Sequence, residues 1–228
     1  MIKYVFFDCD DTLLDFHKAE ALALRRTLEA MGLEPTDQLV ARYSAINQSC
    51  WELLEQKKIT RQELLTRRFD ILYGELGLRL SSGETQDHYI EFLSQGHFFL
   101  PGAPEVLEAL WKEYDLYMVS NGTASVQAGR LKSANISHFF KDIFISETVG
   151  VNKPQKEFFD YCFSHIPGFA SEKAIIVGDS LTSDMLGGNN AGIKTCWYNP
   201  AGKPRREDIP VDYEIRDLME LPELLAEI

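Results

Sequence analysis

Short, continuous hydrophobic runs recur along the chain, and three of them end in small or acidic residues. The three are "YVFFD" at 4–8, "LYMVSNG" at 116–122 and "AIIVGDS" at 174–180. Runs rich in Val, Ile, Tyr and Phe, with no polar alternation, are typical of strands that are covered on both faces. Two further strands are predicted at "DIFIS" (142–146) and "KTCWY" (194–198).

Helical patterns separate these runs. They cover residues 104–113, 124–134, 155–165 and 184–191. Gly192 is a suitable residue to end the last of these helices. Strands that alternate with helices are typical of a parallel, doubly wound α/β sheet. The stretch "NPAGKPRRED" (199–208) is predicted to be a loop.

Residues 16–95 depart from this alternation because their pattern is helical throughout. Within them, Thr60 and Glu63 form a predicted capping box that begins a helix ending near Gly77. An all-helical insert of about 80 residues is too long for an ordinary connection between a strand and the next helix. We therefore expect a separate cap domain at 16–95, inserted into a core formed by 1–15 and 96–228.

The composition indicates a globular protein with an acidic surface. The 228 residues are 45% hydrophobic, which is enough for a substantial core, and the formal net charge is −12. Such a charge argues against binding to a nucleic-acid polymer or to an anionic membrane. An anionic substrate would need attraction from local positive groups or from a metal ion.

Nothing in the sequence predicts export or membrane insertion. No apolar run approaches the roughly 18 residues that span a bilayer, and no export signal is evident. The four cysteines have neither the spacing of a zinc site nor that of a disulfide framework; they are Cys9, Cys50, Cys162 and Cys196. We expect a soluble, cytoplasmic protein.

Polar residues that are suited to catalysis or ligand binding follow the predicted strands. Ligands of open parallel sheets bind beyond the carboxyl ends of the strands, so these residues are predicted to be neighbours. They are Asp8, Asp10 and Thr12 after the first strand, Ser120 and Asn121 after the second, and Asp179 and Asp184 after the third long run.

Asp8 and Asp10 are two residues apart. If the strand continues through them, their side chains share one side at a spacing of about 6.5–7 Å. Two such close carboxylates push their pKa values apart, which separates an ionised nucleophile from a protonated acid. One aspartate would then attack, and the other would protonate the leaving oxygen and later activate water. The alternative is a solvated turn or a helix cap.

The stretch "GDSLTSD" (178–184) offers Asp179 at a strand end and Asp184 at the start of the next helix. A few carboxylate oxygens from separate loops suit Mg²⁺, which retains water and phosphate ligands. The alternative is an Asx turn at Asp179 and a helix cap at Asp184.

The segment "SNG" and a downstream lysine offer donors for phosphate oxygens. Ser120, Asn121 and Gly122 supply hydroxyl, amide and backbone N–H groups at the head of a predicted helix, although the segment is also consistent with a simple turn. Lys153 precedes Pro154, which favours an extended backbone, and Lys156 is a nearby competitor for the same role.

Together, "DCDDT", "SNG", "KP" and "GDSLTSD" resemble, in that order, the motifs of the haloacid dehalogenase superfamily. The resemblance implies a Rossmann-like core with the helical cap of the first structural subclass. It implies that Asp8 is a nucleophile forming an aspartyl phosphate and that Asp10 is the general acid and base. It assigns Thr12, Ser120, Asn121 and Lys153 to phosphate binding. Mg²⁺ would be held by the carboxylates of Asp8 and Asp179 and the backbone carbonyl of Asp10, with Asp184 a direct or water-mediated ligand.

The resemblance also bears on the substrate. Dehalogenating members generally lack an aspartate at the position of Asp10, so a phosphatase acting on a small phosphorylated metabolite is favoured. The stretches 59–78 and 150–163 look like the subgroup of pyrimidine 5′-nucleotidases that act on UMP, dUMP, dTMP and noncanonical analogues. The alternatives are a phosphoglycolate-type phosphatase, a phosphomutase, or a binding module that has lost catalysis. Four cap residues are candidates for contact with a base or ribose, or else are solvated or core positions: Trp51, Arg61, Arg67 and Arg68.

Overall fold

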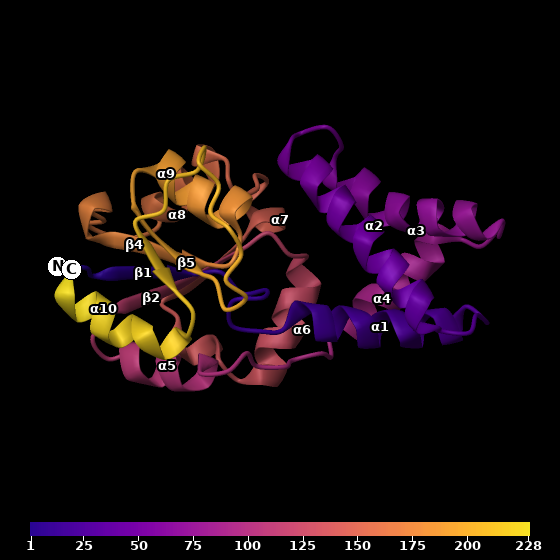
Figure 1. Cartoon of the computed structure of the whole chain (residues 1–228), viewed down its shortest axis with the longest axis horizontal. Coiled ribbons are helices and arrows are strands. Elements are labelled where there is room, and N and C mark those ends of the chain that lie inside the picture. Colours follow the sequence, from indigo (N-terminus) through magenta and orange to yellow (C-terminus); the bar gives the residue numbers. More distant parts are fainter. The chain divides into compact units, whose positions relative to one another are not determined.

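The computed structural model describes all residues 1–228, and they form two compact units (Figure 1). The first, here called the sheet unit, contains Met1–Asp15, Phe98–Ala124 and Ala134–Ile228. The second, the helical unit, contains Phe16–His97 and Ser125–Ser133. The predicted boundaries differ from this division because they assign all of 96–228 to the core. The role of the helical unit as a substrate cap remains a prediction.

The sheet unit is built on six strands, all parallel, in the order β3-β2-β1-β4-β5-β6. This confirms the predicted parallel α/β sheet. The strands are β1 (Tyr4–Phe7), β2 (Asp115–Ser120), β3 (Asp142–Ile145), β4 (Ala174–Gly178), β5 (Lys194–Tyr198) and β6 (Tyr213–Ile215). The five predicted strands are all present. The sixth was not predicted, because three residues are too short to show a hydrophobic pattern.

Helices cover both faces of this sheet. Figure 1 shows α8 (Lys156–Ser164) and α9 (Leu186–Ala191) on one face, and α5 (Ala103–Leu110) and α10 (Leu221–Glu227) on the other. The core on the face of α8 is largely aromatic, with Phe6 stacked on Tyr117. Shorter segments complete the unit: α7 (Ser146–Val149), η1 (Ser137–Phe139), η2 (Ser171–Lys173), the π-helical turn η3 (Leu181–Met185) and η4 (Leu218–Glu220).

Strand β1 is central and fully buried, which explains its continuous hydrophobic run. It lies between β2 and β4, and Phe7 pairs with Met118 on one side and Val177 on the other. The residues that follow β1, β2 and β4 therefore leave the sheet at the same edge.

The helical unit contains α1 (Phe16–Ala30), α2 (Asp37–Glu55), α3 (Arg61–Leu76), α4 (Ser82–Leu93) and most of α6 (Ala124–Ala134). The predicted capping box is confirmed at the start of α3. The Thr60 side chain accepts from the Glu63 N–H, and the Glu63 carboxylate accepts from the Thr60 N–H at 2.7 Å. The helix ends at Gly77, whose φ of 66° is a left-handed conformation that glycine adopts without strain.

A polar network lies inside this unit, at the centre of four helices. Arg68 donates to Asn47 Oδ1 and to Gln86 Oε1, both at 2.7 Å, and Asn47 Nδ2 donates to Glu20 at 2.7 Å. All four side chains are buried. Arg68, which the sequence offered as a candidate for substrate contact, is thus an interior residue in this unit. The Arg61 guanidinium lies over the ring of Trp51, 5.5 Å from its centroid.

Helix α6 joins the helical unit through two close approaches. At Gly129 an added Cβ would lie 2.7 Å from the Ser94 carbonyl oxygen, so only glycine allows the two backbones to pack this tightly. Arg130 is fully buried and donates from Nε to the Gly96 carbonyl at 3.0 Å. The predicted helix at 124–134 is confirmed.

None of the helices combines the length and the hydropathy that a transmembrane span requires. The cytoplasmic location remains a prediction.

Candidate active site

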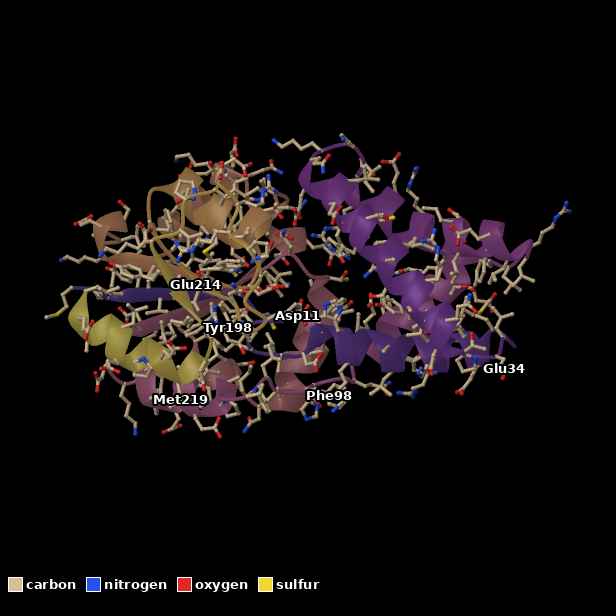
Figure 2. All side chains as sticks on the ribbon, viewed as in Figure 1. Asp11, Glu34, Phe98, Tyr198, Glu214 and Met219 are labelled. Carbon is tan, nitrogen blue, oxygen red and sulfur yellow. The ribbon has the colours of Figure 1, made fainter.

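The loop after β1 brings the first two predicted site residues out of the sheet. The strand ends at Phe7, so the expectation of an extended strand through Asp8 and Asp10 is wrong. The Asp8 N–H still bonds to Val177 O at 2.9 Å, and the chain then turns, with Leu13 and Leu14 both donating to Cys9 O. Figure 2 labels Asp11, which lies in this turn with a φ of 58°.

Lys153 is at the centre of the predicted residues. Its Nζ lies 2.6 Å from Asp8 Oδ1 and 2.7 Å from Asp184 Oδ1, and it donates to Val119 O at 2.8 Å. The side chain is 1% exposed. Lys156, its competitor in the sequence, is exposed and pairs with Asp160. The structure therefore brings Lys153, and not Lys156, to the aspartates.

The side chain of Asn121 bonds to both the N–H and the carbonyl of Lys153. The Lys153 N–H donates to Asn121 Oδ1 at 2.9 Å, and Asn121 Nδ2 donates to Lys153 O at 3.0 Å. The same amide group also donates to Ser183 Oγ at 3.2 Å. Both amide hydrogens thus have protein partners, which favours a positioning role for Asn121 over the predicted phosphate contact. The neighbouring Ser120 is buried, and its Oγ accepts from the Gly122 N–H at 3.0 Å.

Asp179 is fixed through its backbone. The Asp179 N–H donates to Thr12 Oγ1 at 3.1 Å, and the indole Nε1 of Trp197 donates to Asp179 O at 2.8 Å. Thr12 is itself buried, and its Oγ1 lies 3.5 Å from Asp8 Oδ2. Thr12 was predicted from its motif, whereas Trp197 was missed because an aromatic residue in a buried strand is ordinary core.

Asp184 lies in the π-helical turn Leu181–Met185, not at the start of an α-helix as predicted. The helix α9 begins two residues later, at Leu186. The Asp184 carboxylate accepts from the Ser180 N–H at 3.1 Å and packs against Gly178, where an added Cβ would lie 2.3 Å from Oδ2. Glycine at 178 therefore leaves the space that the carboxylate occupies.

Three carboxylates gather in this region. One oxygen from each of Asp8, Asp179 and Asp184 lies within 4.8 Å of the others. Asp10 is not in this group; it is half-buried, and its charge acts on Asp8. The predicted set therefore comes together at one edge of the sheet, with Asp10 at its margin.

The site holds more negative charge than its lysine balances. Burial raises the pKa of Asp8 to about 8, against the opposing charge of Lys153 and with further increases from Asp184 and Asp10. Burial and the charges of Asp184 and Asp8 raise the pKa of Asp179 well above its usual value.

Two lysines counter this charge. Burial alone would lower the pKa of Lys153, but Asp184 and Asp8 outweigh it, so the net change is upward and the ammonium stays charged. The charge of Lys203 offsets a small part of the rise in the pKa of Asp179; this lysine is in the predicted loop 199–208, and nothing in the sequence marked it.

The site combines two motif aspartates, a buried lysine and a second acidic pair at one edge of a parallel sheet. A comparison of the sequence with known protein families agrees with this arrangement. Residues 5–198 match the model of the haloacid dehalogenase-like hydrolases. The chain belongs to this family. It is accordingly a hydrolase, and the resemblance inferred from the four motifs is confirmed.

Individual members of the family are similar over nearly the whole chain. YfnB of Bacillus subtilis is 44% identical over 98% of this chain and 95% of its own length. A crystal structure of YfnB bound to magnesium has a TM-score of 0.94 at 43% identity and covers 98% of both chains. The pyrimidine 5′-nucleotidase PynA of Streptococcus pneumoniae is 37% identical over 98% of this chain and 94% of its own length. YjjG of Escherichia coli, also a pyrimidine 5′-nucleotidase, is 30% identical over 98% of this chain and 97% of its own length.

Proposed function

We propose that this protein is a phosphomonoesterase that hydrolyses pyrimidine nucleoside 5′-monophosphates such as UMP, dUMP and dTMP. The observation that carries the chemistry is the buried Lys153, held between the carboxylates of Asp8 and Asp184. The similarity to PynA and YjjG over nearly full length supports the substrate class.

The proposed reaction has two steps. In the first, an Asp8 carboxylate oxygen attacks phosphorus, the bond from phosphorus to the ester oxygen breaks, and that oxygen takes a proton from Asp10. In the second, water gives its proton to Asp10 and its oxygen bonds to phosphorus. The Asp8–phosphorus bond then breaks, which releases inorganic phosphate and restores both aspartates.

The surrounding residues prepare this reaction. Lys153 stays charged and can face phosphoryl oxygens as they approach Asp8, while its own position is fixed by Asn121. Because the charge of phosphoryl transfer is spread over several oxygens, placement and neutralisation matter more than further covalent chemistry. Ser120, buried at the end of β2, and Thr12, buried after β1, remain candidates for phosphate contact.

The residues present fit a magnesium ion. The three gathered carboxylates are hard oxygen ligands, and burial together with their mutual repulsion raises the pKa values of Asp8 and Asp179, so Lys153 alone does not balance their charge. The carboxylates of Asp8 and Asp179 and the backbone carbonyl of Asp10 would hold the ion, with Asp184 a direct or water-mediated ligand. When bound, Mg²⁺ would neutralise phosphoryl charge and favour the ionised form of Asp8.

Phosphate release from a substrate panel tests this proposal. The panel is UMP, dUMP, dTMP, AMP, phosphoglycolate, glucose 1-phosphate and p-nitrophenyl phosphate, each with Mg²⁺ and with EDTA. We expect metal-dependent release that is fastest with the pyrimidine nucleotides. A preference for phosphoglycolate would reject the nucleotidase proposal, and conversion of glucose 1-phosphate without phosphate release would indicate the phosphomutase alternative.

The variant Asp8→Asn tests the nucleophile. Because an amide cannot attack phosphorus in place of the carboxylate, turnover should fall by at least about 10³-fold while the fold is retained. Circular dichroism and thermal unfolding serve as controls for the fold. Retained turnover in this variant would contradict the role of Asp8.

A further inference from the structure

We propose that Trp197 is a positioning residue for the metal centre: its buried indole fixes the backbone of Asp179 and thereby the direction of the Asp179 carboxylate. This inference rests on the proposed function, because it assumes that Asp179 is a magnesium ligand.

The indole donates to a backbone carbonyl that lies just beyond the paired part of the sheet. Strands β4 and β5 pair up to Gly178 and Trp197, so Asp179 is the first residue beyond the paired region. The backbone of β5 offers this carbonyl no donor beyond the paired region, since the N–H of Asn199 faces β6 and donates to Ile215 O at 2.8 Å. The Trp197 indole donates to Asp179 O at 2.8 Å.

Trp197 is itself held firmly. It is 1% exposed and comes directly before Tyr198, which Figure 2 labels at the end of β5. A buried indole has one donor and no acceptor, so its orientation is determined by this single bond and by the packing of the ring.

The N–H of the same residue is bound by a side chain from the loop that follows β1. Thr12 Oγ1 accepts from the Asp179 N–H at 3.1 Å, so two side chains, one from the loop after β1 and one from β5, bind the backbone of one residue. With its backbone held by these two bonds, Asp179 has its carboxylate grouped with those of Asp8 and Asp184. Groups that orient metal ligands in this way commonly change metal affinity about 10- to 100-fold when removed.

The variant Trp197→Phe retains an aromatic ring but removes the donor. We expect the dissociation constant for Mg²⁺, measured by calorimetric titration of the whole protein, to rise about 10-fold. The KM for Mg²⁺ in phosphate release should rise similarly, while kcat at saturating Mg²⁺ stays within about 3-fold of the wild type.

Trp111→Phe is the matched control. Trp111 donates to Glu108 on the surface, at 3.3 Å, so its removal should leave the affinity for Mg²⁺ unchanged. A purely structural role for Trp197 would lower the melting temperature of the metal-free protein without changing this affinity, and that result would overturn the inference. If the wild type itself does not bind Mg²⁺, the metal-dependent mechanism fails as well, so the two failures are distinguishable.

A second measurement covers the case in which Trp197→Phe does not fold. The chain has three tryptophans, so the double variant Trp51→Phe, Trp111→Phe leaves Trp197 as the only indole fluorophore. Its emission should change on titration with Mg²⁺ and saturate with the dissociation constant found by calorimetry. Emission that does not respond while calorimetry shows binding would reject the inference.

Discussion

Lys153 supplies the positive charge that allows the carboxylates of the site to be buried in the folded protein. The buried ammonium lies within 2.7 Å of two carboxylates, Asp8 and Asp184. Such a buried pair contributes little net stability compared with an apolar substitute, but the loss of one partner leaves charge buried without compensation. The lysine is therefore required for the fold of the site as well as for the proposed binding of phosphoryl oxygens.

The variant Lys153→Met tests this role. It should destabilise the metal-free protein by about 3–5 kcal/mol, because the carboxylates of Asp8 and Asp184 lose their cation, and it should abolish turnover. The free energy of unfolding in urea measures the first effect. Lys156→Met is the control, since that lysine is exposed and pairs only with Asp160; equal losses in both variants would contradict the assignment.

The sequence predicted the charged members of the site, but not the supporting contacts made by Trp197 and Asn121. Asp8 and Asp179 were found because acidic residues after buried strands are unusual, and Lys153 was found from its position before Pro154 and its motif. Trp197 contacts Asp179, the first residue after the paired part of β4. Asn121 contacts Lys153, which is 32 positions away in the sequence. Contacts of this kind leave no local pattern, so only the folded structure could reveal them.

At the scale of elements, local signals located most helices and strands. The capping box of Thr60 and Glu63 marks the start of α3 in the sequence and in the structure. The π-helical turn that contains Asp184 could not be predicted, because it differs from an α-helix in its hydrogen bonds and not in its hydrophobic pattern.

The capping box gives a prediction for the helical unit. Thr60→Ala removes the acceptor for the Glu63 N–H, at 3.2 Å, and should lower the free energy of unfolding by about 1 kcal/mol. Chemical denaturation followed by circular dichroism measures the loss. Thr60→Ser is the control, since a serine hydroxyl can accept the same bond; a similar loss in that variant would show that the hydroxyl is not responsible.

For the whole molecule, the unbalanced charge of the site predicts that magnesium stabilises the fold. A ligand that binds only the folded state adds about 2.7 kcal/mol at 100 times its dissociation constant. The melting temperature should therefore rise with Mg²⁺ concentration above its value in EDTA, and Na⁺ at equal ionic strength should not reproduce the rise. Asp179→Asn should reduce the effect, and an undiminished rise in that variant would place the ion elsewhere.

The position of α6 has a consequence for recombination between relatives. The helical unit is encoded in two separate stretches of sequence, because Ser125–Ser133 packs with Phe16–His97. A chimera that exchanged residues 16–97 alone would set a foreign α4 and its following turn against the resident Gly129 and Arg130, which approach Ser94 and Gly96 closely. The packing of the helical unit can therefore be transplanted intact only when both stretches are inherited together.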